Sequence, residues 1–173
     1  MKTILKMIMA IAAMFTIAGC NELPTVEKIT KVSKAVGKTA GYVCQLSKVK
    51  TEVKDAIVKA IDAVSTVVPT NGQTFAEAWT PLAESELKKL VDAGKLDESG
   101  AQIANQAISI VCDGIDYVFV KYPKAKDAKE LVSAATSGFV TGFKSVVSFA
   151  NGVDANIDID EEAYKYLRLR IAK

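Results

Sequence analysis

The sequence of 173 residues contains no histidine. Histidine is the most common general base near neutral pH and a common zinc ligand, so its absence excludes serine-histidine and cysteine-histidine catalytic sites. No other nucleophile motif takes their place. Carboxylates are available at Glu84, Glu86, Asp113 and Asp116, but acids on helix surfaces are usually only solvated. We therefore expect a protein that is not an enzyme and that holds no metal and no dissociable cofactor.

The first nineteen residues contain no acidic side chain either. Lys2 and Lys6 precede an apolar run over residues 7–18, and this layout is typical of a secretory signal peptide. The run is shorter than the roughly 20 apolar residues that a membrane-spanning helix needs. We therefore expect residues 1–19 to be removed from the mature protein.

The signal peptide ends in a short motif, Ile17-Ala18-Gly19-Cys20, which resembles the lipobox of bacterial lipoproteins. The resemblance implies cleavage before Cys20, attachment of diacylglycerol to its thiol, and acylation of the new amino terminus, for example with palmitate. Each buried methylene contributes about 0.8 kcal/mol, so two or more acyl chains anchor a protein stably. The alternative is an ordinary secretory signal that ends at a cysteine by chance.

The residue after the lipobox indicates which of the two bacterial membranes holds the lipoprotein. In enterobacterial lipoproteins an aspartate at this position favours retention in the inner membrane, and here the residue is Asn21. The resemblance therefore implies an outer membrane lipoprotein that faces the periplasm or the cell surface. Residues 20–24 would form the lipidated N-terminus and a short tether, and residues 25–173 a helical domain.

The sequence also lacks a large excess of positive or negative charge. The chain has 22 basic and 20 acidic side chains, and the signal peptide contains two of the lysines. The mature protein is thus close to neutral, and a nucleic-acid partner has no electrostatic support.

Two cysteines remain once Cys20 is assigned to lipid. The cell envelope is an oxidising compartment, so we predict a disulfide between Cys44 and Cys112. In the chain-entropy picture such a bond would stabilise the fold by roughly 4 kcal/mol. The alternatives are two buried free thiols or a metal-binding pair.

Apolar residues recur at steps of three and four along most of the chain, which predicts amphipathic helices. No stretch alternates with a period of two for long enough to form a sheet. The predicted fold is all-α, a single compact bundle of about six helices in which the disulfide joins the second and fourth. The expected helices cover residues 25–36, 41–68, 74–94, 101–121, 128–150 and 158–173.

Several helix ends carry recognisable signals. Gly37 is expected to terminate the first helix. Thr74 with Glu77, and Ser99 with Gln102, have the spacing of capping boxes. The Thr80-Pro81 pair is expected to kink or split the third helix.

Aspartate or asparagine stands at alternate positions over residues 154–160, as at the start of an EF-hand calcium loop. Ile159 and Lys165, however, occupy the places where that loop needs glycine and glutamate. We expect instead that the acids of residues 158–162 begin the last helix, where they complement the positive end of its dipole.

Phe75, Trp79 and Leu82 would form an exposed aromatic corner if the third helix is split. Such a corner is a candidate binding site for a protein partner. The alternative is that Trp79 fills the core.

Small residues stand four apart at Ala134, Gly138 and Gly142, the spacing at which two helices approach closely. Self-association and membrane insertion are possible uses. Lys144 lies within the apolar stretch, which favours instead a buried helix packed tightly against a neighbour.

These features together predict a membrane-anchored, non-enzymatic lipoprotein that binds a protein partner in the envelope, in an exclusion, immunity, inhibitor or assembly role. The alternative is a carrier or sensor that holds an apolar ligand between its helices, since half of the residues are hydrophobic. A sizeable apolar cavity would favour the carrier. A closed core with an exposed apolar patch would favour partner binding.

Overall fold

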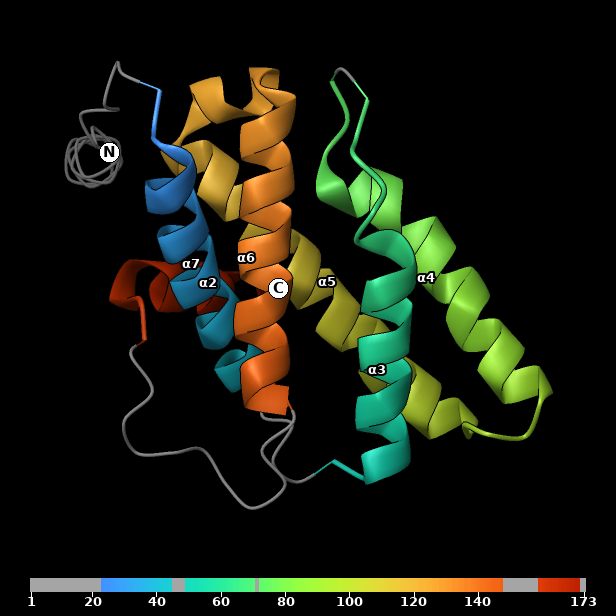
Figure 1. Cartoon of the computed structure of the whole chain (residues 1–173). Coiled ribbons are helices and arrows are strands. Elements are labelled where there is room, and N and C mark those ends of the chain that lie inside the picture. Colours follow the sequence, from blue (N-terminus) through green and yellow to red (C-terminus); the bar gives the residue numbers. More distant parts are fainter. Residues whose placement is uncertain (1–22, 45–48, 71, 148–158, 172–173) are drawn as a thin grey trace, which may run out of the picture.

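The computed structural model of the protein describes residues 23–44, 49–70, 72–147 and 159–171. These residues form six α-helices and one short 3₁₀ helix, with no strand among them (Figure 1). The predicted all-α helical bundle is confirmed. The helices are α2 (Val26–Val43), α3 (Thr51–Val64), α4 (Phe75–Asp92), α5 (Glu98–Lys121), η2 (Pro123–Asp127), α6 (Lys129–Val147) and α7 (Glu161–Ile171).

The longest helix, α5, lies at the centre of the bundle. It contacts α2, α3, α4, α6 and α7, and in Figure 1 it runs diagonally behind α3 and α6. By length and composition alone α5 could cross a membrane, but 56% of its most apolar stretch is buried inside the protein. Such burial is typical of the core helix of a globular domain.

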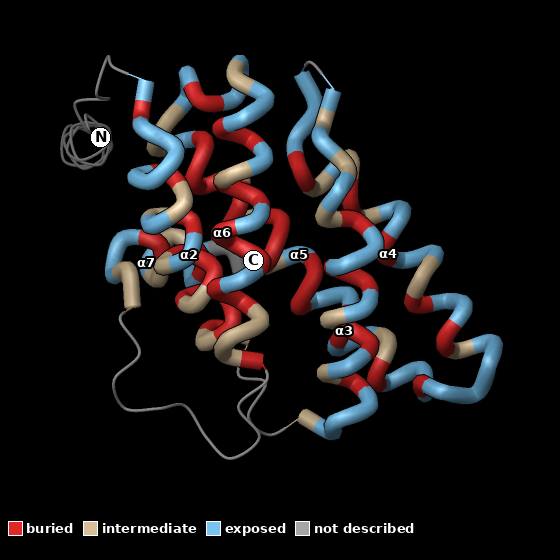
Figure 2. Tube along the Cα trace, viewed as in Figure 1, coloured by how far each residue is buried: buried red, intermediate tan, exposed pale blue. Residues whose placement is uncertain are grey.

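Buried residues line the inner face of each helix (Figure 2). The largest side chains that are fully enclosed are Trp79, Phe119, Phe139 and Phe143. Because these four aromatic side chains come from α4, α5 and α6, one continuous core joins both sides of the bundle.

The small residues of α6 pack closely against a neighbouring helix, as predicted, and the structure shows that this neighbour is α2. A Cβ atom at Gly138 would lie 2.6 Å from the carbonyl oxygen of Thr30, and one at Gly142 would collide with the carbonyl oxygen of Lys34. Ala134 borders the shallow groove that continues this contact towards the start of both helices. The two helices run parallel and side by side (Figure 1).

The α2 side of this contact was not predicted. Gly37 does not end a helix, because α2 continues to Val43. A Cβ atom at Gly37 would collide with the carbonyl oxygen of Phe139, and one at Gly41 would lie 3.0 Å from the Val146 Cβ. Close packing therefore outweighs the cost of glycine in a helix, about 1 kcal/mol.

The second expected helix, 41–68, is wrong at its start, because α2 continues through its close contact with α6. Residues 41–43 belong to α2, which Gly41 helps to pack, and α3 begins only at Thr51. Residues 45–48 lie outside the described part of the chain. The α3 helix then ends at Val64, four residues before the predicted end.

The capping box at the start of α4 is confirmed. The Glu77 backbone N–H donates to the Thr74 hydroxyl over 3.1 Å, and the Thr74 N–H donates to the Glu77 carboxylate over 2.8 Å. Of the kink or split predicted at Pro81, the split is wrong, since α4 is one continuous helix. Pro81 has no backbone N–H, so the carbonyl of Glu77 lacks its usual hydrogen bond within the helix. Both residues are exposed, so water can hydrogen-bond that carbonyl instead.

The starts of α5 and α7 depend on aspartates. The α5 cap is Asp97, whose carboxylate accepts from the Gly100 N–H over 2.6 Å, so the predicted box at Ser99 and Gln102 is wrong. Asp160 accepts from the Ala163 N–H over 2.9 Å and begins α7, as its acidic surroundings predicted. The calcium-like pattern over residues 154–158 and the predicted helix end at residue 150 lie outside the described residues.

The predicted disulfide is wrong, because Cys44 and Cys112 are both free thiols in the structure. Cys112 lies two residues before Gly114, and about 100° of rotation per residue places such positions on opposite sides of a helix. Gly114 faces Ala40 of α2, whereas the Cys112 side chain hydrogen-bonds Thr80 of α4. Cys112 therefore points away from α2, whose C-terminal end carries Cys44.

We expect an alkylating reagent to label both Cys44 and Cys112 in denatured protein that has not been reduced. In the native protein Cys112 should stay unlabelled, because it is fully buried and burial raises the pKa of its thiol to about 12. Peptide mass spectrometry with and without denaturant checks both results. If neither cysteine is labelled in the unreduced, denatured protein, the two are bonded and this part of the structure is wrong.

Candidate functional site

The end of the bundle at which α2 begins is the candidate site. We call it the tether end; it comprises residues 23–30, residues 66–74 apart from the undescribed residue 71, and residues 120–133. The Lys28 ammonium lies 5.8 Å from the centre of the Tyr122 ring, which places the start of α2 beside the end of α5. Cys20, the predicted lipid attachment site, precedes the first described residue, Leu23, by three positions and lies outside the described chain.

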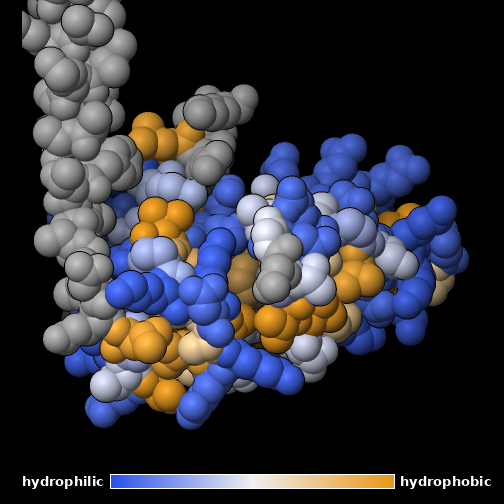
Figure 3. Space-filling view, turned by 90° about the horizontal axis from the view of Figure 1, so that it is seen from above, coloured by the Kyte–Doolittle hydropathy of each residue, from blue (hydrophilic) through white to orange (hydrophobic). Residues whose placement is uncertain are grey.

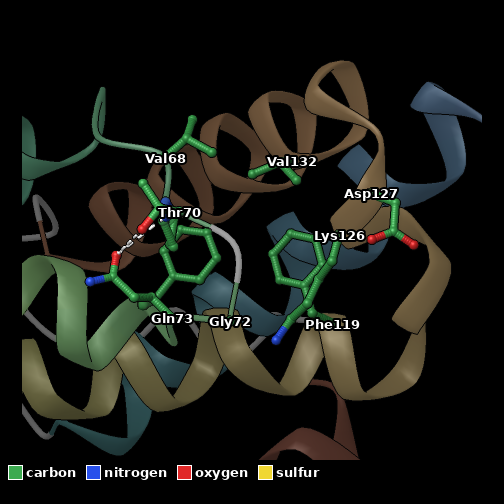
Figure 4. A pocket seen from close by; sticks show the side chains of 10 residues that line it. Val68, Thr70, Gly72, Gln73, Phe119, Lys126, Asp127 and Val132 are labelled. Carbon is green, nitrogen blue, oxygen red and sulfur yellow. Dashed lines mark hydrogen bonds between the residues drawn. The ribbon is translucent and has the colours of Figure 1, made fainter.

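A pocket of about 270 Å³ opens at this end (Figure 4). Its apolar part contains Phe75 and Phe119, whose rings stack with centroids 5.5 Å apart and planes 7° from parallel. Val68 and Val132 line it from the loop after α3 and from α6. The pocket is thus built from two stretches of the chain, residues 68–75 and residues 119–132, that are distant from each other in sequence.

Polar groups surround the opening of this pocket. The Thr70 hydroxyl donates to the Gln73 side-chain oxygen over 2.8 Å. The Lys126 ammonium lies 6.0 Å from the centre of the Phe119 ring, at the outer limit of a cation–π contact, and Asp127 also lines the pocket. The pocket therefore offers an aromatic surface with one cation and one anion at its edge.

Asp116 stabilises the start of α4, whose first residue, Phe75, lines the pocket. Its carboxylate accepts from the Phe75 N–H over 3.2 Å, so it provides a negative charge at the N-terminus of α4. Burial raises the pKa of Asp116, and its backbone hydrogen bonds and Lys126 oppose that rise. The carboxylate that the sequence left as either solvated or functional is a half-buried helix cap.

The predicted aromatic corner is wrong for two of its three residues. Trp79 is fully buried, packs edge-on against Phe75 with ring centroids 5.1 Å apart, and donates from Nε1 to the Val67 carbonyl over 2.8 Å. Phe75 is 3% exposed, and only Leu82, at 46%, reaches solvent. The cause is the unbroken α4, which keeps both aromatic residues on its buried face.

The described residues contain no group of three or more acidic or cysteine side chains able to hold a metal ion. Burial raises the pKa of the Cys44 and Cys112 thiols to about 12, so neither forms a nucleophilic thiolate at neutral pH. The pocket was missed from the sequence because no local spacing connects Phe119, Lys126 and Val68.

No protein family, curated protein or solved structure matches this chain.

Proposed function

We propose that the protein is a lipoprotein of the bacterial cell envelope, anchored through acyl chains on Cys20, whose helical domain binds a protein partner there. The observation that carries the proposal is the lipobox motif at the end of an apolar, lysine-led signal segment. An exclusion, immunity, inhibitor or assembly role fits a small anchored domain that acts by binding. Asn21 favours the outer membrane as its location.

The alternative function, a carrier of an apolar ligand, has less support. The pocket beside Phe75 and Phe119 is smaller than the roughly 300 to 1,000 Å³ of typical small-molecule sites, and it is rimmed by Lys126 and Asp127. The larger groove beside Ala134, of about 740 Å³, is shallow and open to solvent, so it does not enclose a ligand. Between the helices, the side chains of Trp79, Phe139 and Phe143 fill the centre of the bundle. Native mass spectrometry of the protein purified from membranes separates the two functions, since a carrier should retain a lipid-sized ligand.

Cys20→Ala is expected to move the protein from the membrane fraction to the soluble fraction. The substitution removes the only thiol that the lipobox presents for acylation, and with it the acyl chains that hold the protein on the bilayer. Fractionation and intact mass spectrometry measure location and lipid mass together. Cys44→Ala is the matched control and should keep both, because Cys44 lies at the end of α2 within the folded domain.

A Cys20→Ala variant that stays fully membrane-bound would contradict the anchor. Partner binding is tested separately, by placing a photocrosslinking amino acid at the exposed Leu82 in the lipidated protein. The same crosslinker at Leu169, which is exposed on α7, is the control for non-specific capture. A defined adduct at Leu82 but not at Leu169 supports a protein partner on this side of α4, and the lack of an adduct at Leu82 argues against one there.

A further inference from the structure

We propose that the tether end lies directly against the bilayer, so that its exposed apolar side chains contact the boundary between the lipid headgroups and the acyl chains. This inference rests on the proposed anchoring at Cys20. It adds an orientation: one end of the bundle faces lipid, and the long sides of the helices face the periplasm or the cell exterior.

The length of the tether restricts how the domain can meet the membrane. At 3.3 to 3.6 Å per residue, the peptide from Cys20 to Val26 spans at most about 22 Å. Helix α2, with 18 residues, is about 27 Å long at 1.5 Å per residue. The tether is therefore shorter than the bundle, and the far end of α2 cannot turn to the bilayer while Cys20 stays in it.

The exposed apolar side chains gather at this same end. Of the seven large hydrophobic residues exposed in the described part of the chain, four belong to the tether end. Scattered single residues of this kind are common on soluble proteins, but a group on one face marks an interaction surface. Figure 3 shows the hydrophobic patches on this face. The four are Leu23 (59% exposed), Val26 (42%), Val68 (41%) and Val120 (63%).

The charges around these residues fit a membrane interface. Lysines can extend their ammonium groups to the headgroups while their stems cover apolar surface. Nearby acids nearly balance the lysines, so the contact should depend on apolar burial more than on anionic lipid. The exposed lysines are Lys28, Lys124, Lys126 and Lys129, and the exposed acids are Glu27, Asp127 and Glu130.

Two positions on α5 test the orientation. Val120 lies in its last turn at the tether end, and Ile103, which is 36% exposed, lies in its second turn at the other end. Val120→Cys and Ile103→Cys each introduce an accessible thiol into a protein whose own Cys112 is buried and whose Cys20 is acylated in the anchored form. An environment-sensitive dye on each cysteine then compares lipid contact at the two ends of the same helix.

The experiment uses the full lipidated protein in vesicles of phosphatidylethanolamine and phosphatidylglycerol that contain a nitroxide-labelled lipid. We expect the dye at position 120 to shift to shorter wavelength and to be quenched several-fold more than the dye at position 103. Emission of Trp79 checks that both variants are folded. The unsubstituted protein is labelled in parallel, and the signal of any dye bound to Cys44 is subtracted as background.

The two proposals fail in different ways. If the protein does not sediment with the vesicles, the anchor is wrong and the orientation falls with it. If it sediments but the two dyes are quenched equally, or position 103 more strongly, the anchor stands and the orientation alone is overturned. A contrast that is lost at roughly 1 M salt, where the screening length is about 3 Å, would also overturn the apolar contact.

Discussion

Trp79→Ala should lower the free energy of unfolding by about 3 to 5 kcal/mol, the usual cost of emptying a tryptophan site in a core. Trp79 is fully buried, packs against Phe75, and donates from its indole N–H to the Val67 carbonyl. The substitution therefore leaves a cavity and an unpaired carbonyl beneath the loop that follows α3. Urea denaturation followed by circular dichroism measures the change, since the chain has no other tryptophan.

Leu82→Ala is the matched control for this result. Leu82 lies on the same helix three residues later but is 46% exposed, so its truncation should cost less than about 1 kcal/mol. Trp79→Phe should fall between the two, because the ring volume is partly kept and the hydrogen bond is lost. Equal effects of Trp79→Ala and Leu82→Ala would show that Trp79 is a surface residue and that it does not fill the core.

Gly142→Ala should destabilise the protein by about 2 to 3 kcal/mol, the cost of overpacking a close contact. In a free helix the same change would stabilise by up to about 1 kcal/mol, because alanine is the better helix former. The sign of the effect thus reports on the contact with α2, where the added Cβ would collide with the carbonyl oxygen of Lys34. Urea titration followed by Trp79 emission gives the free energy.

Ser137→Ala on the exposed side of α6 serves as the control for the glycine substitution. It should leave stability unchanged to within about 0.5 kcal/mol or raise it slightly. Gly37→Ala, on the opposite side of the same contact, should destabilise as Gly142→Ala does, because its Cβ would meet the Phe139 carbonyl. A stabilised Gly142→Ala variant would mean that α2 and α6 do not pack at backbone distance.

The sequence predicts features that depend on residues close together in the chain. The helical character of the fold follows from apolar residues three and four apart, and the start of α4 follows from Thr74 and Glu77. The close contact made by Gly138 and Gly142 was also predictable, because small residues four apart lie on one face of a helix. The anchor at Cys20 remains a prediction from sequence alone.

The candidate site depends on contacts that local spacing does not encode. The pocket joins Val68, Phe119 and Lys126 from separate elements, and no pattern in the chain places them together. The apolar group of the tether end likewise combines the start of α2, the loop after α3 and the end of α5. Their proximity follows from how the helices pack, and it became visible only in three dimensions.

The sequence by itself determined the helical character of the fold, the starts of α4 and α7 and the tight face of α6, because each depends on side chains within about two turns of one another. The tertiary structure decided which neighbour each helix face meets. It placed Cys112 towards Thr80 instead of Cys44, made Gly37 a packing residue instead of a cap, and buried Trp79. The physical reason is that a helical repeat specifies which residues share a face, whereas the partner of that face is chosen by the packing of the whole bundle.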